Sequence, residues 1–380
     1  MDFKMDEMHQ DLLDMYREFA QNTVKPLAAE IDRDERFPEE TVKQMAEMNL
    51  LGIPFPEEFE GAGMDNLSYA QCVEELSKVC ASTGVIVSAH TSLCAWPIYH
   101  FGTDEQKKKY LPDLCSGRKL GAFGLTEPGA GTDAAMQKTV AEDKGDHFLL
   151  NGSKIFITNA GPAETYVVFA MTDKSQGTKG ISAFILEKGM DGFTIGKHEE
   201  KMGIRGSATC ELVFQDVKVP KENLLGELGK GFKVAMMTLD GGRIGIASQA
   251  LGIAEGAIEE TVKYVSEREQ FGKRISQFQN TQFELAQMRA NTEAAKLLVY
   301  QAASAKDAGE PYSHLAAMAK LFAARNASDV TRRCLQLYGG YGYTREYPIE
   351  RMMRDAKITE IYEGTSEVQM MVIAGWMGVK

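Results

Sequence analysis

The sequence predicts an α+β protein of three consecutive domains: a helical N-terminal domain (1–120), a middle β domain (121–225) and a C-terminal helical bundle (226–380). The chain of 380 residues is longer than one hydrophobic core usually supports. Apolar residues recur at helical spacing in the first and last thirds, and after Leu120 this period gives way to short β-branched and aromatic runs. Because no helical pattern separates those runs, we expect an antiparallel barrel or sandwich.

Each domain has its own expected elements. The clearest turn signal is Asn151-Gly152 between two apolar runs, which is typical of a type I′ hairpin joining strands 148–150 and 154–158. Further strands are expected over 166–171, 181–186 and 211–219. Helices are expected over 5–34, 38–51, 68–79, 84–101, 104–116, 231–268, 279–306 and 312–338, the last three packed as an antiparallel bundle.

Composition excludes several classes of function. The net charge of −12 argues against nucleic-acid binding, which needs a basic surface. The six cysteines form no C-x-x-C pair and the six histidines no ligand spacing, so we expect no metal and no disulfide framework, but buried free thiols in a reducing compartment. The sequence shows no signal-peptide core and no apolar run long enough to cross a bilayer. We expect a cytoplasmic protein, or a mitochondrial matrix protein if a presequence has been removed.

The densest motif is the small-residue segment 121–134. Gly129, Gly131 and Ala134 formally match the G-x-G-x-x-A dinucleotide fingerprint, but Pro128 interrupts it and no helix is expected to open there. The remaining interpretation is a loop whose backbone N–H groups approach an anionic or planar cofactor, with hydroxyl donors at 126 and 132. An ordinary glycine-rich turn is the alternative.

Shorter motifs suggest contacts with such a cofactor or with a substrate. In a regular strand, Phe156 and Thr158 would place a ring and a hydroxyl on one face, which suits a flat ring cofactor. Two glycines precede Arg243 in a predicted helix, which is costly unless something packs closely there; Arg243 could hold a phosphate, orient a substrate or simply lie on the helix surface. The glycines in 268–272 and 336–343 expose backbone but are also typical of helix C-caps.

The candidate for chemistry is Glu363, in the segment 361–369. Gly364 and a Thr-Ser pair follow it, as in a tight loop that opens a helix, with Thr365 or Ser366 as the cap. A glutamate held in an apolar pocket has a raised pKa and can act as a general base on a carbon-bound proton. By itself, the segment is more typical of an ordinary helix cap.

Together, these segments resemble the acyl-CoA dehydrogenase family over essentially the whole chain, and most closely its short-chain, butyryl-CoA branch. The motifs are F-G-L-T-E-P-G-A-G-T-D, K-I-F-I-T-N, R-E-Q-F-G-K, Q-L-Y-G-G-Y-G-Y and I-Y-E-G-T-S-E. The resemblance implies a helical domain, a β domain and a four-helix bundle, in a homotetramer that binds one FAD per subunit, oxidises acyl-CoA and passes electrons to electron transfer flavoprotein. It also implies that Glu363 removes the α-proton while the β-hydride passes to flavin N5.

The family's functional residues transfer to this chain position by position. The expected FAD contacts are Phe123, Leu125, Thr126, Gly131, Thr132, Phe156, Ile157, Thr158, Arg268, Phe271, Gln279, Gln336, Leu337, Gly339, Gly340, Thr365, Ser366 and Glu367, with those at 268–340 serving a neighbouring subunit. The expected substrate contacts are Thr132, Asp240, Arg243 and Gly364.

Two departures from relatives in the family argue against certain substrates. Relatives acting on isovaleryl-CoA or long-chain acyl-CoA carry their glutamate base at the position of Gly242, so those substrates are disfavoured here. Glutaryl-CoA dehydrogenases bind the distal carboxylate with an arginine aligned with Gly84, so a charged acyl tail has no evident partner. Two alternatives remain: an acyl-CoA oxidase, which passes electrons to oxygen and usually has a longer chain, and a helical scaffold that has lost the chemistry.

Overall fold

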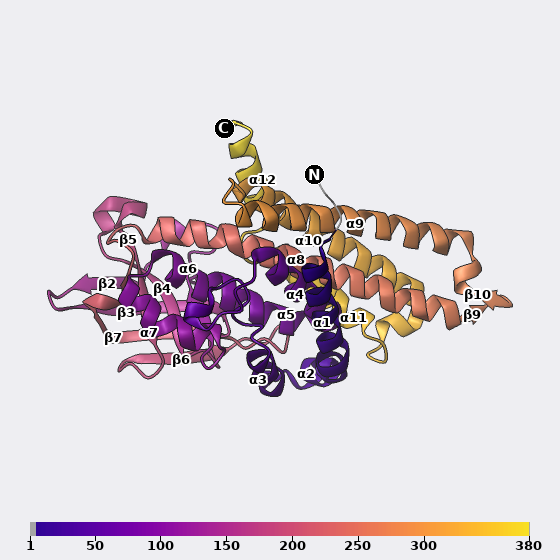
Figure 1. The fold of residues 1–380 in the computed structure, drawn as a ribbon, viewed down its shortest axis with the longest axis horizontal. Helices are drawn as coiled ribbons and strands as arrows, with labels where there is room; N and C mark the ends of the chain where they lie inside the picture. Colours follow the sequence, from indigo (N-terminus) through magenta and orange to yellow (C-terminus); the bar gives the residue numbers. More distant parts are fainter. Residues whose placement is uncertain (1–4, 380) are drawn as a thin grey trace.

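The computed structural model describes residues 5–379 and confirms the predicted helix–β–helix architecture. The molecule is elongated, with the β-rich part at one end and the long helices α8 and α9 leading to a small hairpin at the other end (Figure 1). The N-terminal helices lie between the β-rich part and the hairpin end of the long helices (Figure 1).

The N-terminal part is helical, but two of its expected helices are divided. The expected helix 5–34 changes to π- and 3₁₀-helical turns around Pro26, which has no N–H to donate. The expected helix 84–101 contains a π-helical segment in which the Ser92 hydroxyl donates to the Ser88 carbonyl, 2.7 Å away. The helices are α1 (Glu7–Phe19), a π-helix (Ala20–Val24), a 3₁₀-helix (Lys25–Leu27), α2 (Ala28–Asp34), α3 (Glu39–Glu47), a 3₁₀-helix (Glu57–Phe59), α4 (Asn66–Val79), α5 (Ala81–Ser88), a π-helix (Ala89–Ala95), α6 (Trp96–Phe101) and α7 (Asp104–Cys115).

The middle part is a mixed sheet, so the expectation of a purely antiparallel sheet was wrong. Strand β1 pairs with β4 in parallel, and β2 meets β4 in parallel at one position. The chain between β1 and β4 is long enough to return in the same direction, which parallel pairing requires. The sheet order is β6-β7-β3-β2-β4-β5-β8, with β1 also on β4. The strands are β1 (Gly121–Gly124), β2 (Val140–Asp143), β3 (His147–Thr158), β4 (Thr165–Met171), β5 (Ile181–Glu187), β6 (Phe193–His198), β7 (Thr209–Pro220) and β8 (Leu224–Leu225).

The predicted hairpin at Asn151-Gly152 was also wrong. Both residues lie inside the single strand β3, where the register against β7 shifts by a bulge. Gly152 has φ +141°, and a Cβ there would come within 2.6 Å of the Thr139 hydroxyl. The Asn151 side chain exchanges hydrogen bonds with Asp216 on β7, at 3.0 and 2.8 Å. The asparagine and glycine thus serve a bulge in place of a turn.

The C-terminal part is a bundle in which α10 packs against α8 and α9, as expected, and α4 of the N-terminal part packs against α8. Buried charges fasten α4 to it: Glu255 of α8 binds Lys78 of α4 and Lys296 of α9, both at 2.7 Å. The elements are α8 (Gly231–Glu267), β9 (Glu269–Gln270), β10 (Lys273–Arg274), a 3₁₀-helix (Ile275–Gln277), α9 (Gln279–Asp307), α10 (Ser313–Tyr338), a 3₁₀-helix (Gly339–Tyr343), α11 (Ile349–Ile358) and α12 (Ser366–Trp376).

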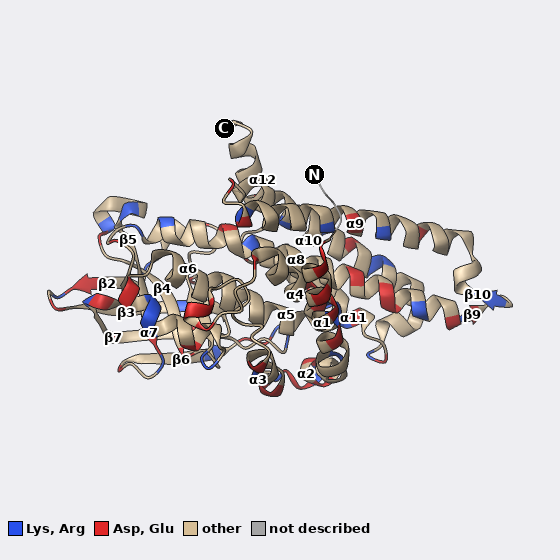
Figure 2. Cartoon of the chain, viewed as in Figure 1, with Lys and Arg blue, Asp and Glu red and all other residues tan. Residues whose placement is uncertain are grey.

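The cysteine side chains agree with the expectation from composition. All six cysteines are free and buried, as predicted. Acidic and basic residues are interspersed along the helices in the view of Figure 2. Between residues 5 and 379, no helix is long and apolar enough to cross a membrane, and no three His, Cys, Asp or Glu side chains gather as metal ligands would.

Candidate active site

Glu363 lies in the short loop between α11 and α12, with its side chain turned into the protein. Its φ is +51°, a left-handed conformation that is uncommon for a residue other than glycine. Gly364 follows with φ +91°, and Thr365 caps α12 by accepting from Val368 N at 3.4 Å. The predicted loop and helix cap are both confirmed, and the loop aims a carboxylate inward.

The Glu363 carboxylate reaches the backbone of α8 at a glycine. A Cβ built on Gly242 would lie 2.3 Å from Glu363 Oε2 and 2.8 Å from Leu93 Cδ2. The same Oε2 atom is buried and has no hydrogen-bond partner among the described residues. The close packing that two adjacent glycines suggested in α8 is therefore present, and its partner is the candidate base.

Burial raises the pKa of Glu363 to about 8, and the positive charges of Lys320 and Arg243 oppose this rise. Lys320, on α10, donates to the Tyr362 carbonyl at 2.9 Å and to the Gly364 carbonyl. Cations thus approach the loop from both α8 and α10. A carboxyl group with a pKa near neutrality is suited to accept a proton from a weak carbon acid.

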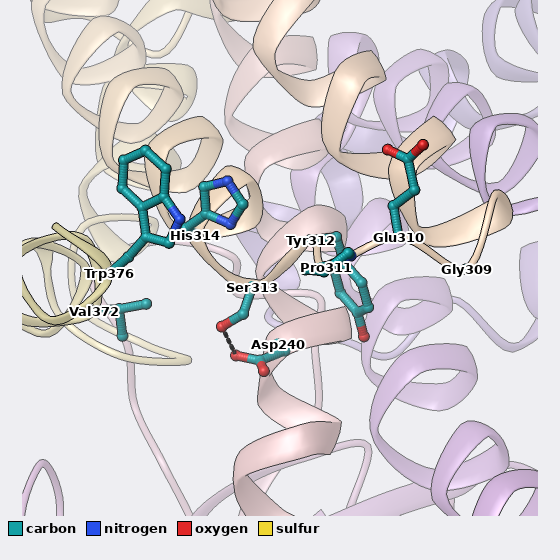
Figure 3. A pocket seen from close by; sticks show the side chains of 9 residues that line it. All are labelled: Asp240, Gly309, Glu310, Pro311, Tyr312, Ser313, His314, Val372 and Trp376. Atoms are coloured by element: carbon teal, nitrogen blue, oxygen red, sulfur yellow. Dashed lines mark hydrogen bonds between the residues drawn. The ribbon is translucent and has the colours of Figure 1, made fainter. Parts of the chain in front are cut away.

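Asp240 and Arg243 lie one helical turn apart on α8 and form an ion pair. Figure 3 shows Asp240 also accepting a hydrogen bond from the Ser313 hydroxyl, 2.8 Å away, at a cavity of about 490 Å³. His314 stacks on Trp376 of α12 at the edge of this cavity, with ring centroids 4.4 Å apart. Arg243 is 5% exposed and its Nε has no partner among the described residues. The alternative that Arg243 simply lies on the helix surface is therefore wrong.

The two segments expected to line a flavin lie side by side in the β part. Ile155 N donates to the Thr126 carbonyl at 2.9 Å, which joins β3 to the loop after β1. A second bulge interrupts β3 between Lys154 and Ile157, and Phe156 there has φ +59° and a 59% exposed side chain. Regular alternation, on which the shared face of Phe156 and Thr158 was predicted, therefore does not hold in this stretch. Ile157 is buried in the core.

A buried ion pair holds this loop. Lys154 Nζ donates to Glu127 Oε1 at 2.7 Å, to the Leu125 carbonyl at 3.0 Å and to Gln137 Oε1 at 3.1 Å. Glu127 also accepts from the backbone N–H of Thr139 at 3.0 Å. No α-helix opens after Gly131, which confirms that the dinucleotide fingerprint was correctly rejected.

The residues expected to bind the FAD diphosphate and adenosine gather at the opposite end of the molecule. Arg268, Gln336, Leu337, Gly339 and Gly340 line one cavity of about 540 Å³. Phe271, in the turn of the β9–β10 hairpin, is 95% exposed, and Gln279 begins α9 and is exposed. In Figure 1 this hairpin lies at one end of the chain and the sheet at the other.

Comparison with known proteins covers all three parts of the chain. Models of the acyl-CoA dehydrogenase N-terminal, middle and C-terminal domains match residues 6–118, 122–217 and 229–378. The chain belongs to the acyl-CoA dehydrogenase family. Members of this family are FAD flavoproteins and oxidoreductases.

Individual relatives confirm the likeness to the short-chain branch. The short-chain specific acyl-CoA dehydrogenase of Clostridium acetobutylicum is 62% identical over 375 residues, covering 99% of both chains. The butyryl-CoA dehydrogenase structure from Megasphaera elsdenii has a TM-score of 0.98 at 54% identity, covering 99% of this chain and 100% of the other. A chain in the structure described as the electron transferring flavoprotein of Acidaminococcus fermentans also has a TM-score of 0.98, at 58% identity and 99% coverage of both chains.

Sequence reasoning missed the two fully buried lysines, Lys154 and Lys320. For Lys320 a signal existed, because it lies at helical spacing within an alanine stripe that includes Ala316, Ala323, Ala324 and Ala327. A lysine on the apolar face of a helix needs a partner. Lys154 gave a weaker signal, since strand alternation alone does not distinguish its buried side from the solvent side.

Proposed function

We propose that this protein is an FAD-dependent dehydrogenase of short-chain acyl-CoA thioesters, in which Glu363 removes the substrate α-proton. One observation carries the proposal: the Glu363 carboxylate is buried against the Gly242 backbone, with its Oε2 unpartnered among the described residues, in a loop that α8 and α10 flank with cations. The raised pKa keeps this group in the range where it can exchange a proton near neutral pH.

The residues around Glu363 fit a thioester substrate. We assign Gly364 and Thr132 to the thioester end and Asp240 with Arg243 to the CoA arm, because Asp240, which pairs with Arg243, lines a cavity beside α12. Butyryl-CoA is the proposed substrate, in keeping with the butyryl-CoA dehydrogenase of Megasphaera elsdenii. A charged acyl tail would need a partner such as an arginine at position 84. A Cβ on Gly84 would come within 2.0 Å of Ser77 Oγ, so the structure leaves no room for that arginine.

The flavin loop fits the isoalloxazine of FAD. A Cβ at Gly129 or Gly131 would meet no atom within 4 Å, so the backbone there is open to a ligand. Phe156 is exposed and held in a left-handed conformation, and such strain is often retained at binding sites. Bound FAD supplies the hydride acceptor. The chain contributes the base, the hydroxyls of Thr126 and Thr158, and the remaining flavin contacts at Phe123, Leu125, Ile157, Thr365, Ser366 and Glu367.

We further propose a homotetramer in which Arg268, Phe271, Gln279 and the 336–340 segment complete the FAD site of a neighbouring subunit. The support is geometric, since this cavity lies beside the β9–β10 hairpin, at the end of the chain opposite the sheet that carries the flavin loop (Figure 1). The exposed apolar side chains Met371, Trp376 and Met377 of the C-terminal segment also fit burial between subunits.

Electrons are proposed to pass to electron transfer flavoprotein, the protein named for the structure from Acidaminococcus fermentans. A reducing, cytoplasmic setting fits the free buried thiols. Fast anaerobic bleaching of the flavin by butyryl-CoA followed by slow reoxidation in air is the expected result. Rapid peroxide formation would point to an acyl-CoA oxidase.

The decisive experiment is Glu363→Gln. The amide keeps the size of the side chain but cannot accept the proton, so FAD content and butyryl-CoA binding should persist while flavin reduction falls by about 10²–10⁴-fold or more. Glu360→Gln, the same change three residues earlier, is the matched control and should reduce flavin at a normal rate. Normal reduction in Glu363→Gln would refute the assignment of the base.

A further inference from the structure

We propose that Lys320 is the positioning residue of the catalytic loop: its ammonium group fastens the peptide carbonyls on both sides of Glu363 and holds a positive charge against the carboxylate. This inference rests on the proposed role of Glu363 as the base. Lys320 lies outside the sequence motifs that carry the expected flavin and substrate contacts.

The partners of Lys320 are unusual for a buried lysine. The residue is 0% exposed on α10, and Nζ donates to Tyr362 O at 2.9 Å and to Gly364 O. Among residues 5–379, no carboxylate oxygen lies within 4.0 Å of its Nζ. Burying an ammonium group without a close counter-ion is costly. Here it is directed at the two carbonyl groups that flank one glutamate.

The loop needs such a restraint because its backbone is strained. Glu363 at φ +51° occupies a conformation that costs on the order of 1–3 kcal/mol in a residue other than glycine. Gln369 Nε2 adds a hydrogen bond to Gly364 O at 2.8 Å, and the Tyr362 hydroxyl bonds to Gln249 of α8. Lys320 alone among these groups spans the loop from Tyr362 to Gly364.

The charge of Lys320 also acts on the base. The ionisable groups that face Glu363 are Lys320 from α10, Arg243 from α8, Tyr69 from α4 and Tyr362 within the loop. Both tyrosines have pKa values raised by burial and stay neutral. Arg243 is paired with Asp240, whereas Lys320 donates to two carbonyl groups.

Other charges act on Lys320 in turn. Burial lowers its pKa to about 8, and Arg243 adds to this lowering. Glu363, Glu360 and Glu367 oppose it. The two side chains therefore titrate in one pH range, and loss of the ammonium charge removes a force that favours the Glu363 carboxylate.

The test compares Lys320→Met, Lys320→Gln and Lys320→Arg in the FAD-loaded protein, with Lys357→Met, an exposed lysine of α11, as control. The rate of flavin reduction by butyryl-CoA is measured from pH 6 to about 10, a range set by the shifted pKa of the base. Lys320→Met should move the rising limb to higher pH by about one unit or more. At neutral pH its limiting rate should fall on the order of 10²-fold while the butyryl-CoA Kd stays within a few fold.

Lys320→Arg, which keeps the charge, should restore the midpoint of the pH profile. Hydrogen exchange of peptide 360–369, measured without substrate, should accelerate in Lys320→Met and remain normal in Lys357→Met. If Lys320→Met does not retain FAD, Lys320→Gln takes its place with the same criteria. Loss of FAD from both uncharged variants would overturn the proposal, because Lys320 would then be needed for folding or FAD retention in general and not for the loop in particular.

Two further outcomes are separable. If the unmodified protein bleaches with butyryl-CoA and Lys320→Met shows an unchanged pH midpoint and loop exchange, only the role of Lys320 is refuted. If no acyl-CoA bleaches the unmodified protein, the proposed function itself fails.

Discussion

Gly242→Ala tests the packing of the base against α8. The added Cβ would lie 2.3 Å from Glu363 Oε2, whereas ordinary van der Waals contact begins near 3.4 Å, so the carboxylate must retreat by 3.4 − 2.3 = 1.1 Å. A displacement of about 1 Å in a catalytic group can cost on the order of 10²-fold in rate. We expect Gly242→Ala to retain FAD and to lose about that much in the rate of flavin reduction by butyryl-CoA.

A neighbouring glycine provides the control. In Gly241→Ala the new Cβ meets the flexible end of Lys306 at 3.1 Å, so the lysine can move aside and the rate should change little. Both variants gain helix propensity of about 1 kcal/mol, so a rate loss confined to Gly242→Ala would not reflect weakened helix formation. Stopped-flow bleaching under anaerobic conditions measures both rates.

The same contact predicts that the base can be moved. Glu363→Gly combined with Gly242→Glu should recover part of the activity that Glu363→Gly lacks, and shift the preferred acyl length, because position 242 faces the same space. A full rate in Gly242→Ala would refute the placement of the carboxylate. A double variant that binds butyryl-CoA without bleaching would show that only the loop can present the base.

Three further variants or conditions test other parts of the site. kcat/KM for butyryl-CoA should rise with pH through about 8, since Glu363 with a raised pKa is protonated and inactive below that value; a profile flat from pH 6 to about 10 would contradict this. Arg268→Ala should lower FAD content after gel filtration while the far-ultraviolet spectrum stays unchanged, and normal flavin content would contradict the shared site. Lys154→Met leaves the Glu127 carboxylate buried and unpaired, so urea unfolding should show a loss of about 3–5 kcal/mol; a loss below about 1 kcal/mol would show that the pair does not hold the flavin loop.

The errors of sequence-based prediction in this chain were errors of tertiary context. Asn151-Gly152 is a strong local hairpin signal, yet the neighbours Thr139 and Asp216 use it for a bulge inside β3. The parallel pairing of β1 with β4 depends on where a long connection returns, which local periodicity does not encode.

The sequence alone determined the helix–β–helix order, the family and the candidate base, because periodicity and contiguous motifs such as I-Y-E-G-T-S-E are local properties of the chain. Only the tertiary structure decided that Glu363 meets Gly242, that Lys320 binds the carbonyls beside it, and that the β9–β10 hairpin lies at the end of the chain opposite the sheet. Those contacts join residues 42 to 121 positions apart. The cost of burying a charge is set by all neighbours at once, which no single segment reveals.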